Sequence, residues 1–354
     1  MDNQKRINLQ VLIQRAKRLA SSHEVILLTS NKEKTKNQTD YTEYSVTSEF
    51  LSEDEETVII GALHRIGFSV RQFHNEEDFI AFVLTEHTDM SNKIVINSAQ
   101  KGTRIGRKSL IPAICDLFGI TYVGSNPYVV SLCRDKYRCG CILAQNGISV
   151  PQAWLYQPAE GWFLEPPTTD VPLIVKPNYE AASIGIDASS ICNGFAVNEK
   201  VRQLASIYHQ EIVAERFISG YEVEVPVIVS HNVATDFFPV GINLDSNKKM
   251  GNRILDYNLR GVDAYDYYDF TLENPQAAQV VLDATIRTAQ ILNINGFGRV
   301  DFRILDNGET YVTDIATNPH YTVRSSYEYL FKQLGLNYDD MIACLVATSV
   351  EEKA

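Results

Sequence analysis

The chain has 354 residues, of which 45% are hydrophobic and 10% aromatic, so it is long enough for two or three folded domains. Its formal net charge of −12 argues against a nucleic-acid binder, because such binding depends on clustered Lys and Arg. The six cysteines follow neither a metal-binding nor a disulfide spacing, so free thiols are expected. Without a signal-peptide core or a membrane-length apolar run, we expect a cytoplasmic protein with no membrane partner.

The first third of the chain alternates predicted helices with predicted strands. Apolar residues recur at helical spacing, and Ser52 is the expected N-cap of the second helix. The predicted helices span residues 7–20, 54–66, 76–84 and 109–118. The predicted strands span residues 24–28, 69–73, 93–97 and 121–123. This alternation indicates a parallel sheet with helices on its faces, which we assign to an N-terminal α/β domain of residues 1–123.

The middle of the chain mixes shorter elements. After a turn at Gly124, the apolar pattern predicts one long helix over residues 129–145 and another over residues 195–207. Short β-rich runs predict strands at residues 151–156, 173–175 and 212–217. We assign this region to a small α/β domain of residues 124–214.

The last part, residues 215–354, is predicted to form a third domain. Residues 245–268 are polar and rich in Tyr, and they are long for a structureless connection, so they are either functional or disordered. The predicted strands are residues 223–229 and 233–240, which form a hairpin, and two further strands around Asn307. The predicted helices are residues 275–292, 327–334 and 338–348.

Asn307-Gly308 lies between two β-rich runs and is the strongest hairpin signal in the chain. If these two residues form the turn, Asp301 lies directly opposite Asp314. The alternation of side chains then places one polar face on the hairpin, formed by Arg299, Asp301, Asp314 and Ala316. The opposite, core-facing side is predicted to hold Phe302, Ile304, Tyr311 and Ile315.

Two carboxylates directly across a ladder repel each other, so a positive charge is expected between Asp301 and Asp314. One candidate is a divalent cation such as Mg²⁺, which usually arrives with substrate phosphates. The other is a solvated acidic hairpin in which Arg299 neutralises the pair. The hairpin by itself leaves both interpretations open.

Lys176 follows the buried run Leu173–Val175 and precedes a loop of small residues, Ala181–Gly185. An ammonium group beside exposed backbone N–H groups is a plausible phosphate site, although an ordinary lysine at a strand end is the more common case. Glu215 and Glu222 lie where a strand meets a loop and could accept hydrogen bonds from adenine or ribose. Taken singly, they are more typical of solvated surface charges.

Taken in chain order, these segments resemble the signatures of ATP-grasp ligases, and in particular of the D-alanine–D-alanine ligase group. The resemblance covers about residues 120–345, and the first domain resembles the family only in architecture. The matching segments are Gly124-Ser125, Asp135-Lys136, Gly147–Pro151, Ile174–Pro177, Glu180–Gly185, Glu215–Glu222, Arg299–Asp301, Asp314–Pro319 and Ser325. The resemblance implies an α/β ATP-grasp fold that follows an N-terminal parallel-sheet domain.

The resemblance also implies a nucleotide site for ATP. Its residues would be Lys136 and Lys176 for the phosphates, Ser183 in the phosphate loop, Glu215 with the backbone of Arg216 and Ile218 for adenine, Phe217 beside the ring, and Glu222 for the ribose. Phosphoryl transfer depends mostly on positioning and charge neutralisation, for which lysines and Mg²⁺ are suited.

For the metal and the substrates, the resemblance implies a second group of residues. Asp301 and Asp314 would bind Mg²⁺, with Asn318 as a possible further ligand, and Arg299 would stabilise the tetrahedral oxyanion. Substrate contacts are expected from Arg260, His320 and Ser325. The implied activity is that of an ATP-dependent carboxylate–amine ligase that acts through an acyl phosphate, and amino acids are the expected small-molecule partners. A homodimer is left open.

The chain departs from the family pattern at several positions. Where the family has Glu-x-Asn-x-x-Pro-Gly, residues 314–320 place Ala316 at the Asn and His320 at the Gly. One serine of the phosphate loop is absent, and Arg260-Gly261 aligns with Lys-Tyr. These changes gather where the amino-acid substrates would bind, and they predict a substrate other than D-alanine. The alternatives are a true D-alanine–D-alanine ligase of cell-wall synthesis and a degenerate nucleotide-binding regulator, the latter suggested by Ala316.

Overall fold

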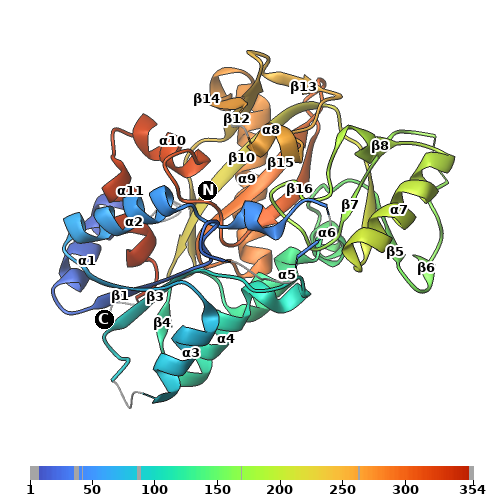
Figure 1. Cartoon of the computed structure of the whole chain (residues 1–354). Helices are drawn as coiled ribbons and strands as arrows, with labels where there is room; N and C mark the ends of the chain where they lie inside the picture. The colour runs from blue at the N-terminus through green and yellow to red at the C-terminus, as the bar shows by residue number, and fades with distance from the viewer. Residues whose placement is uncertain are drawn as a thin grey trace.

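The computed structural model describes residues 8–35, 40–41, 43–85, 89–168, 170–261 and 264–350. It contains a four-stranded, a five-stranded and a seven-stranded β-sheet, each built from a separate part of the chain (Figure 1). Within these ranges, no helix has both the length and the apolar character needed to cross a membrane. The cavity that concerns function is lined by strands of the second and third sheets and by residues of two short turns in the first part of the chain.

The first sheet is entirely parallel, as the alternating pattern predicted, with strand order β2-β1-β3-β4. Its strands are β1 (Glu24–Thr29), β2 (Ser69–Phe73), β3 (Lys93–Ser98) and β4 (Thr121–Tyr122). The helices between them are α1 (Leu9–Ala20), α2 (Glu53–Ile66), α3 (Glu76–Thr85) and α4 (Leu110–Phe118). Ser52 caps α2 as predicted, because its hydroxyl accepts from the Glu55 N–H while the Glu55 carboxylate accepts from the Ser52 N–H.

The two faces of this sheet are covered by different sets of helices. Alternate residues of β1 divide between two cores, with Leu27 packed among residues of α1 and α2, and Leu28 packed beside Phe79 of α3. The first of these cores also contains Leu345, which belongs to α11 (Tyr338–Ala347) at the far end of the chain. Figure 1 shows α11 beside α1 and α2, with α10 (Ser326–Gln333) leading into it.

The second sheet is antiparallel, with order β6-β5-β9-β7-β8. Helix α7 (Phe195–Tyr208) packs on β7 and β9 and supplies half of the buried residues in the apolar core of this part. The strands are β5 (Ala153–Gln157), β6 (Gly161–Phe163), β7 (Leu173–Pro177), β8 (Ile191–Cys192) and β9 (Ile212–Arg216).

The predicted long helix over residues 129–145 is wrong, because the chain forms two helices, α5 (Pro127–Arg134) and α6 (Lys136–Gln145). Asp135 leaves the helical conformation at ψ 89° and caps α6 by accepting from the Arg138 N–H at 3.0 Å. The Lys136 N–H donates instead to the carbonyl of Asn178, in the loop that follows β7. The break therefore fixes the start of α6 against that loop and carries Lys136 into the cavity.

The third sheet has the main path β14-β12-β10-β15-β16, with β11 and β13 also paired to β10. Helix α9 (Pro275–Leu292) covers one face. The strands are β10 (Gly220–Ser230), β11 (Val233–Asp236), β12 (Val240–Leu244), β13 (Lys249–Gly251), β14 (Tyr265–Asp269), β15 (Gly296–Ile304) and β16 (Thr310–Ala316). The predicted strand 233–240 is thus two separate strands. The described part of residues 245–268 is structured, since it holds β13, the short helix α8 (Tyr257–Gly261) and β14.

The sheets suggest where the units of the chain begin and end. The first sheet ends at Tyr122, next to the boundary expected after residue 123. Glu215 and Arg216 lie in β9, which belongs to the second sheet. We therefore propose a boundary after Arg216 instead of after residue 214. The last helix, α11, follows the third sheet in sequence but packs on α1 and α2, while α10 packs on β10 of the third sheet and on α11.

The close approach of β10 to β15 can be tested at Gly220, at the start of β10. Its φ is 122°, and a Cβ at this position would lie 2.0 Å from the carbonyl oxygen of Ile304. Gly308 in the β15–β16 turn also has a positive φ, 88°, but a Cβ there would have nothing within 4 Å. We expect Gly308→Ala to cost about 1 kcal/mol from backbone strain, and Gly220→Ala to cost about 3 kcal/mol or more because overpacking adds to that strain. Urea unfolding of both variants would measure this, and equal losses would contradict the close approach.

Candidate active site

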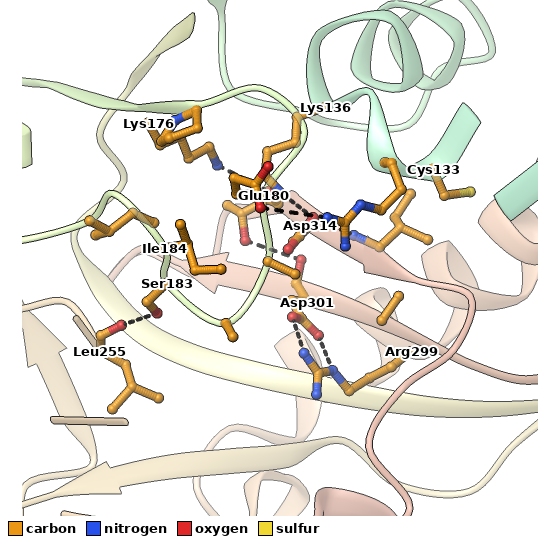
Figure 2. Close-up of a pocket in the computed structure, with 18 of the residues that line it drawn as sticks. Cys133, Lys136, Lys176, Glu180, Ser183, Ile184, Leu255, Arg299, Asp301 and Asp314 are labelled. Atoms are coloured by element: carbon orange, nitrogen blue, oxygen red, sulfur yellow. Dashed lines mark hydrogen bonds and ion pairs between the residues drawn. The ribbon is translucent and has the colours of Figure 1, made fainter. Parts of the chain in front are cut away.

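The candidate site is a cavity bounded by the β15–β16 hairpin, strands β7 and β9, the loop after β7 and the junction of α5 with α6. Most residues predicted from the sequence line it: Lys136, Lys176, Ser183, Glu215, Arg216, Phe217, Ile218, Glu222, Arg299, Asp301, Asp314, Asn318 and His320. Figure 2 shows Lys136, Asp314, Asp301 and Arg299 grouped on the hairpin side, with Ser183 and Ile184 facing them from the loop. Residues from distant parts of the sequence therefore converge on one cavity.

The hairpin has the predicted pairing at its polar end but not the predicted turn. Ile304 pairs with Thr310, and the Leu305 N–H donates to the Glu309 carbonyl, so the loop is longer than the two residues Asn307-Gly308. The register then shifts between Asp301 and Phe302, because Thr313 is an extra, bulged residue.

The bulge offsets the longer turn, with two consequences. Asp301 still lies opposite Asp314, and Arg299 opposite Ala316, as predicted. Tyr311 does not lie on the core face, which corrects the prediction. It pairs with Arg303 and is partly exposed, while Val312 packs in the core beside Phe302.

The two facing carboxylates are neutralised by different cations. Arg299 donates from two nitrogens to the two oxygens of Asp301, at 2.7 Å each, and also lies 3.3 Å from Glu224. Lys136 Nζ donates to Asp314 Oδ1 at 2.8 Å. Arg299 therefore neutralises only Asp301, and Lys136, at the start of α6, neutralises Asp314.

The surroundings move the pKa values of these two carboxyl groups in opposite directions. Burial raises the pKa of Asp301 to about 6, and the Arg299 guanidinium offsets only part of that effect. Burial also acts upward on Asp314, but Lys136 and Lys176 outweigh it and hold the pKa of Asp314 below its usual value. Asp314 is the carboxylate that is fully ionised near neutral pH.

The donor set on the hairpin fits Mg²⁺. Three carboxylates, those of Asp301, Asp314 and Glu224, form ion pairs with two cations, Arg299 and Lys136, while Lys176, which also acts on Asp314, is itself paired with Glu215. Mg²⁺ commonly binds through one or two carboxylates together with substrate phosphates, and two of these groups lie side by side on one face. Within the described ranges, no three His, Cys, Asp or Glu side chains gather into a metal site of their own. The Asn318 side-chain amide donates to the Asn97 carbonyl at 3.0 Å, which leaves its oxygen as the only possible ligand atom.

Lys176 connects two of the sheets across the cavity. From β7 its Nζ lies 2.8 Å from Glu215 of the neighbouring strand β9, and 3.4 Å from the carbonyl oxygen of the bulged residue Thr313. The side chains of Lys176 and Glu215 are each 8% exposed. A charged lysine in this position can approach a phosphate without leaving its carboxylate partner.

The predicted adenine segment, Glu215 to Ile218, lies along the cavity wall. The Arg216 N–H is already bonded to the Gln152 carbonyl at 2.8 Å, so only its carbonyl remains for adenine. The Phe217 ring lies under the guanidinium of Arg303, with 5.3 Å between the guanidinium carbon and the ring centroid. Arg303 also reaches Glu222 at 3.5 Å.

Sequence reasoning missed Arg303 and Glu224, although the alternation of side chains along their strands points to both. Arg303 is two residues after Asp301 and therefore on the same face of β15, and Glu224 is two residues after Glu222 on β10. Glu224 lies opposite Asp301 in the β10–β15 pairing. Extending the alternation by one step would have identified both residues.

The loop after β7 is held by contacts that its small residues make possible. Ala182 and Ser183 both have positive φ, 51° and 58°. The Ser183 hydroxyl donates to the Leu255 carbonyl at 2.7 Å, as Figure 2 shows, so it fixes the loop to the segment before α8. On the same side, the Tyr257 N–H donates to the Ile186 carbonyl.

The predicted substrate residues fall in three different places. His320 is exposed and lines the cavity. Ser325 is not among the lining residues, because its buried hydroxyl caps α10, accepting from the Glu328 N–H and donating to the Thr322 carbonyl. The Arg260 side chain lies outside the part of the chain that the structure describes.

The structure also brings together a group of charged residues at the cavity that sequence reasoning did not identify as a group. We call Glu49, Arg107, Lys108, Arg134 and Glu180 the basic cluster, since it holds three cations and two carboxylates. Glu180 belongs to the loop after β7, Arg134 to α5, and the other three to short 3-10 turns at Val46–Glu49 and Ile105–Lys108. The cluster thus links the first domain to the loop.

Comparisons with known proteins agree with this geometry. Residues 150–347, more than half of the chain, match the family model described as D-ala D-ala ligase C-terminus. A D-alanine–D-alanine ligase from Bordetella petrii is 26% identical over 245 residues, which covers 69% of this chain and 72% of the relative. One from Neisseria gonorrhoeae (strain NCCP11945) is 28% identical over 300 residues, which covers 82% of this chain and 90% of the relative.

The fold also matches a solved structure. The crystal structure of a D-alanine–D-alanine ligase from Bacillus anthracis complexed with ATP aligns with a TM-score of 0.66 at 18% identity, covering 92% of this chain and 97% of that chain. This likeness confirms the predicted α/β ATP-grasp fold with an N-terminal parallel sheet. With the family match over the C-terminal half, it shows that the chain belongs to the D-alanine–D-alanine ligase family, whose members are ATP-dependent ligases that form carbon–nitrogen bonds.

Proposed function

We propose that this protein joins the carboxyl group of one small molecule, an amino acid or a related acid, to the amine of another at the expense of ATP. The observation that carries the proposal is the meeting of Asp301, Asp314, Lys136, Lys176 and Arg299 in one cavity. Such a set provides acidic groups for a metal–nucleotide complex and cations for the charge that develops during phosphoryl and acyl transfer.

In this proposal the nucleotide lies between the β7–β9 edge and the hairpin. Lys136 and Lys176 hold its phosphates, Glu215 and the Arg216 carbonyl hold adenine beside Phe217, and Glu222 accepts from the ribose. Asp301 and Asp314, with Asn318 as a further candidate, would hold Mg²⁺, which supplies neutralisation of phosphate charge when bound.

The chemistry then follows in two transfers. A carboxylate oxygen of the acid attacks the γ-phosphorus of ATP, ADP leaves, and an acyl phosphate remains. The amine attacks the acyl carbon, and phosphate leaves as the amide forms. Arg299 is placed for the oxyanion of the second transfer, because it lines the cavity while Asp301 and Glu224 fix its guanidinium.

Two other functions have less support. A nucleotide-binding regulator that has lost catalysis was suggested by Ala316, yet both carboxylates and both lysines line the cavity together. A ligase that uses D-alanine, as the names of the relatives state for those proteins, does not account for Ala316, for His320 in the cavity or for the basic cluster.

The first prediction concerns nucleotide binding. Lys176→Ala should weaken ATP binding by about tenfold or more, because it removes a charge-assisted contact to phosphate. Calorimetric titration with a non-hydrolysable ATP analogue would measure this. Lys248→Ala is the control, because Lys248 is an exposed lysine paired with Glu273. Since Lys176→Ala leaves Glu215 unpaired, thermal unfolding should be recorded in parallel. Unchanged affinity in a folded variant would remove Lys176 from the site.

A second prediction concerns the metal. Asp301→Asn should lose most phosphate release, because one of two carboxylates facing the ion is neutralised. The variant should lose stability because Arg299 loses its bidentate partner, but it should remain folded, since Glu224 still lies 3.3 Å from Arg299 and the change relieves the repulsion between Asp301 and Asp314. Steady-state turnover across a Mg²⁺ titration, with circular dichroism of the same sample, tests both parts. Near-normal turnover would refute the assignment.

The third prediction concerns the substrate. D-Alanine should support phosphate release poorly in comparison with other amino acids, because His320 and the basic cluster alter the lining. A phosphate-release assay over amino acids of both chiralities would show it. Rapid formation of D-alanyl-D-alanine would instead make the protein a D-alanine–D-alanine ligase in the strict sense.

A further inference from the structure

Two groups of charged residues at the cavity carry opposite unbalanced charge. On the hairpin side, three carboxylates are paired with Arg299 and Lys136, and Lys176, which also acts on Asp314, is itself paired with Glu215, so a metal ion suits this group. The basic cluster, by contrast, has three cations and two carboxylates. An unpaired buried charge is costly, so each group favours a ligand group of the missing sign. At the basic cluster that group is an anion.

Both carboxylates of the basic cluster are already fully engaged. Glu49 accepts from Arg107 and Arg134, each at 3.1 Å, and from Lys108. Glu180 accepts from Arg107 and from the Tyr41 hydroxyl, each at 2.7 Å, and from Gln210 at 2.9 Å. Neither carboxylate can receive a substrate ammonium group without losing these contacts.

Of the three cations in the basic cluster, Lys108 and Arg134 face the cavity. Arg107 is completely buried behind them, with its side chain 0% exposed, and does not line the cavity. The side chain of Arg134 is 10% exposed, and its Nε has no hydrogen-bond partner among the residues described. Burial, together with the neighbouring Arg134 and Arg107, lowers the pKa of Lys108 to about 8 despite the attraction of Glu49. A further negative group nearby would favour the charged lysine.

We propose that Lys108 and Arg134 bind a second carboxylate of the acid substrate, so that the enzyme activates a dicarboxylic acid, such as an acidic amino acid, in preference to a neutral one. The inference rests on the proposed ligase function and specifies its substrate class. The carboxyl group that reacts lies toward Arg299 and the hairpin, and the second carboxylate lies at the basic cluster. Arg and Lys make their strongest hydrogen bonds to such charged groups.

The test uses substrates that differ in one charge. Aspartate is compared with asparagine, and glutamate with glutamine, in both chiralities, with saturating ATP and with hydroxylamine as the amine. Phosphate release and hydroxamate formation are both recorded. We expect kcat/KM for the acidic member of at least one pair to exceed that of its amide by tenfold or more.

Two variants locate the source of that preference. Lys108→Met should lower kcat/KM for the dicarboxylate by about tenfold or more and leave the amide nearly unchanged. Lys101→Met is the matched control, because Lys101 lies in the same domain but is 59% exposed and paired with Glu77. Arg134→Lys, which keeps a cation near Glu49, provides a milder second variant and should reduce the preference partially.

The outcomes separate this inference from the proposed function. If the amides react as well as the acids, or if Lys108→Met slows both equally, the inference is wrong while the ligase remains. If Lys108→Met weakens the binding of an ATP analogue by the same factor as the binding of the acid, the two cations bind phosphate, and the inference of a dicarboxylate substrate is wrong. A protein that binds ATP but neither binds nor uses any dicarboxylate refutes the inference as well. Absence of ATP binding in the unmodified protein would refute the proposed function itself.

Discussion

Burial of charge is the constraint on which the architecture of this site depends. Removing one partner of a buried ion pair is strongly destabilising, because the other charge is left without compensation. Here the partners come from different parts of the fold. Arg107 of the first domain pairs with Glu180 of the second, and Lys136 at the start of α6 pairs with Asp314 of the third sheet. Lys176 pairs with Glu215 and also reaches the β16 backbone. The relative placement of the three sheets is therefore a condition for neutralising the cavity.

The same constraint explains why the cavity is polarised. Charges within each pair largely cancel, so the uncompensated charge is concentrated at the hairpin and at the basic cluster. A cationic ligand group beside the hairpin and an anionic one beside the basic cluster would complete both. In our proposal, a metal–nucleotide complex would supply the first and the acid substrate the second.

The sequence predicted those features that depend on local patterning. The parallel first sheet, the capped start of α2 and the polar face of the hairpin all follow from periodicity and turn chemistry. The division between α5 and α6 could not be predicted that way, because apolar residues continue at helical spacing across Asp135. What ends α5 is a contact to Asn178, more than forty residues away in the chain. The basic cluster is similarly composed of residues brought together only by the tertiary fold.

The hairpin shows how a correct prediction can follow from an incorrect step. The turn is longer than two residues, and the bulge at Thr313 restores the facing pair. Bulges re-aim side chains next to functional sites, and this one also directs the Thr313 carbonyl toward Lys176. Without the bulge, Asp314 would lie on the apolar face.

The position of α11 has a consequence for biosynthesis. The helix packs between elements made first, α1 and α2, and contributes Met341, Leu345 and Ala347 to their core. On a ribosome the first sheet emerges long before α11 does, so one of its apolar faces stays incomplete until α11 has been synthesised. Chains of multidomain proteins commonly fold from the N-terminus as they emerge. In this protein the first sheet can be completed only after the second and third sheets have been translated, and a chain terminated before α11 would expose the core face that α11 covers.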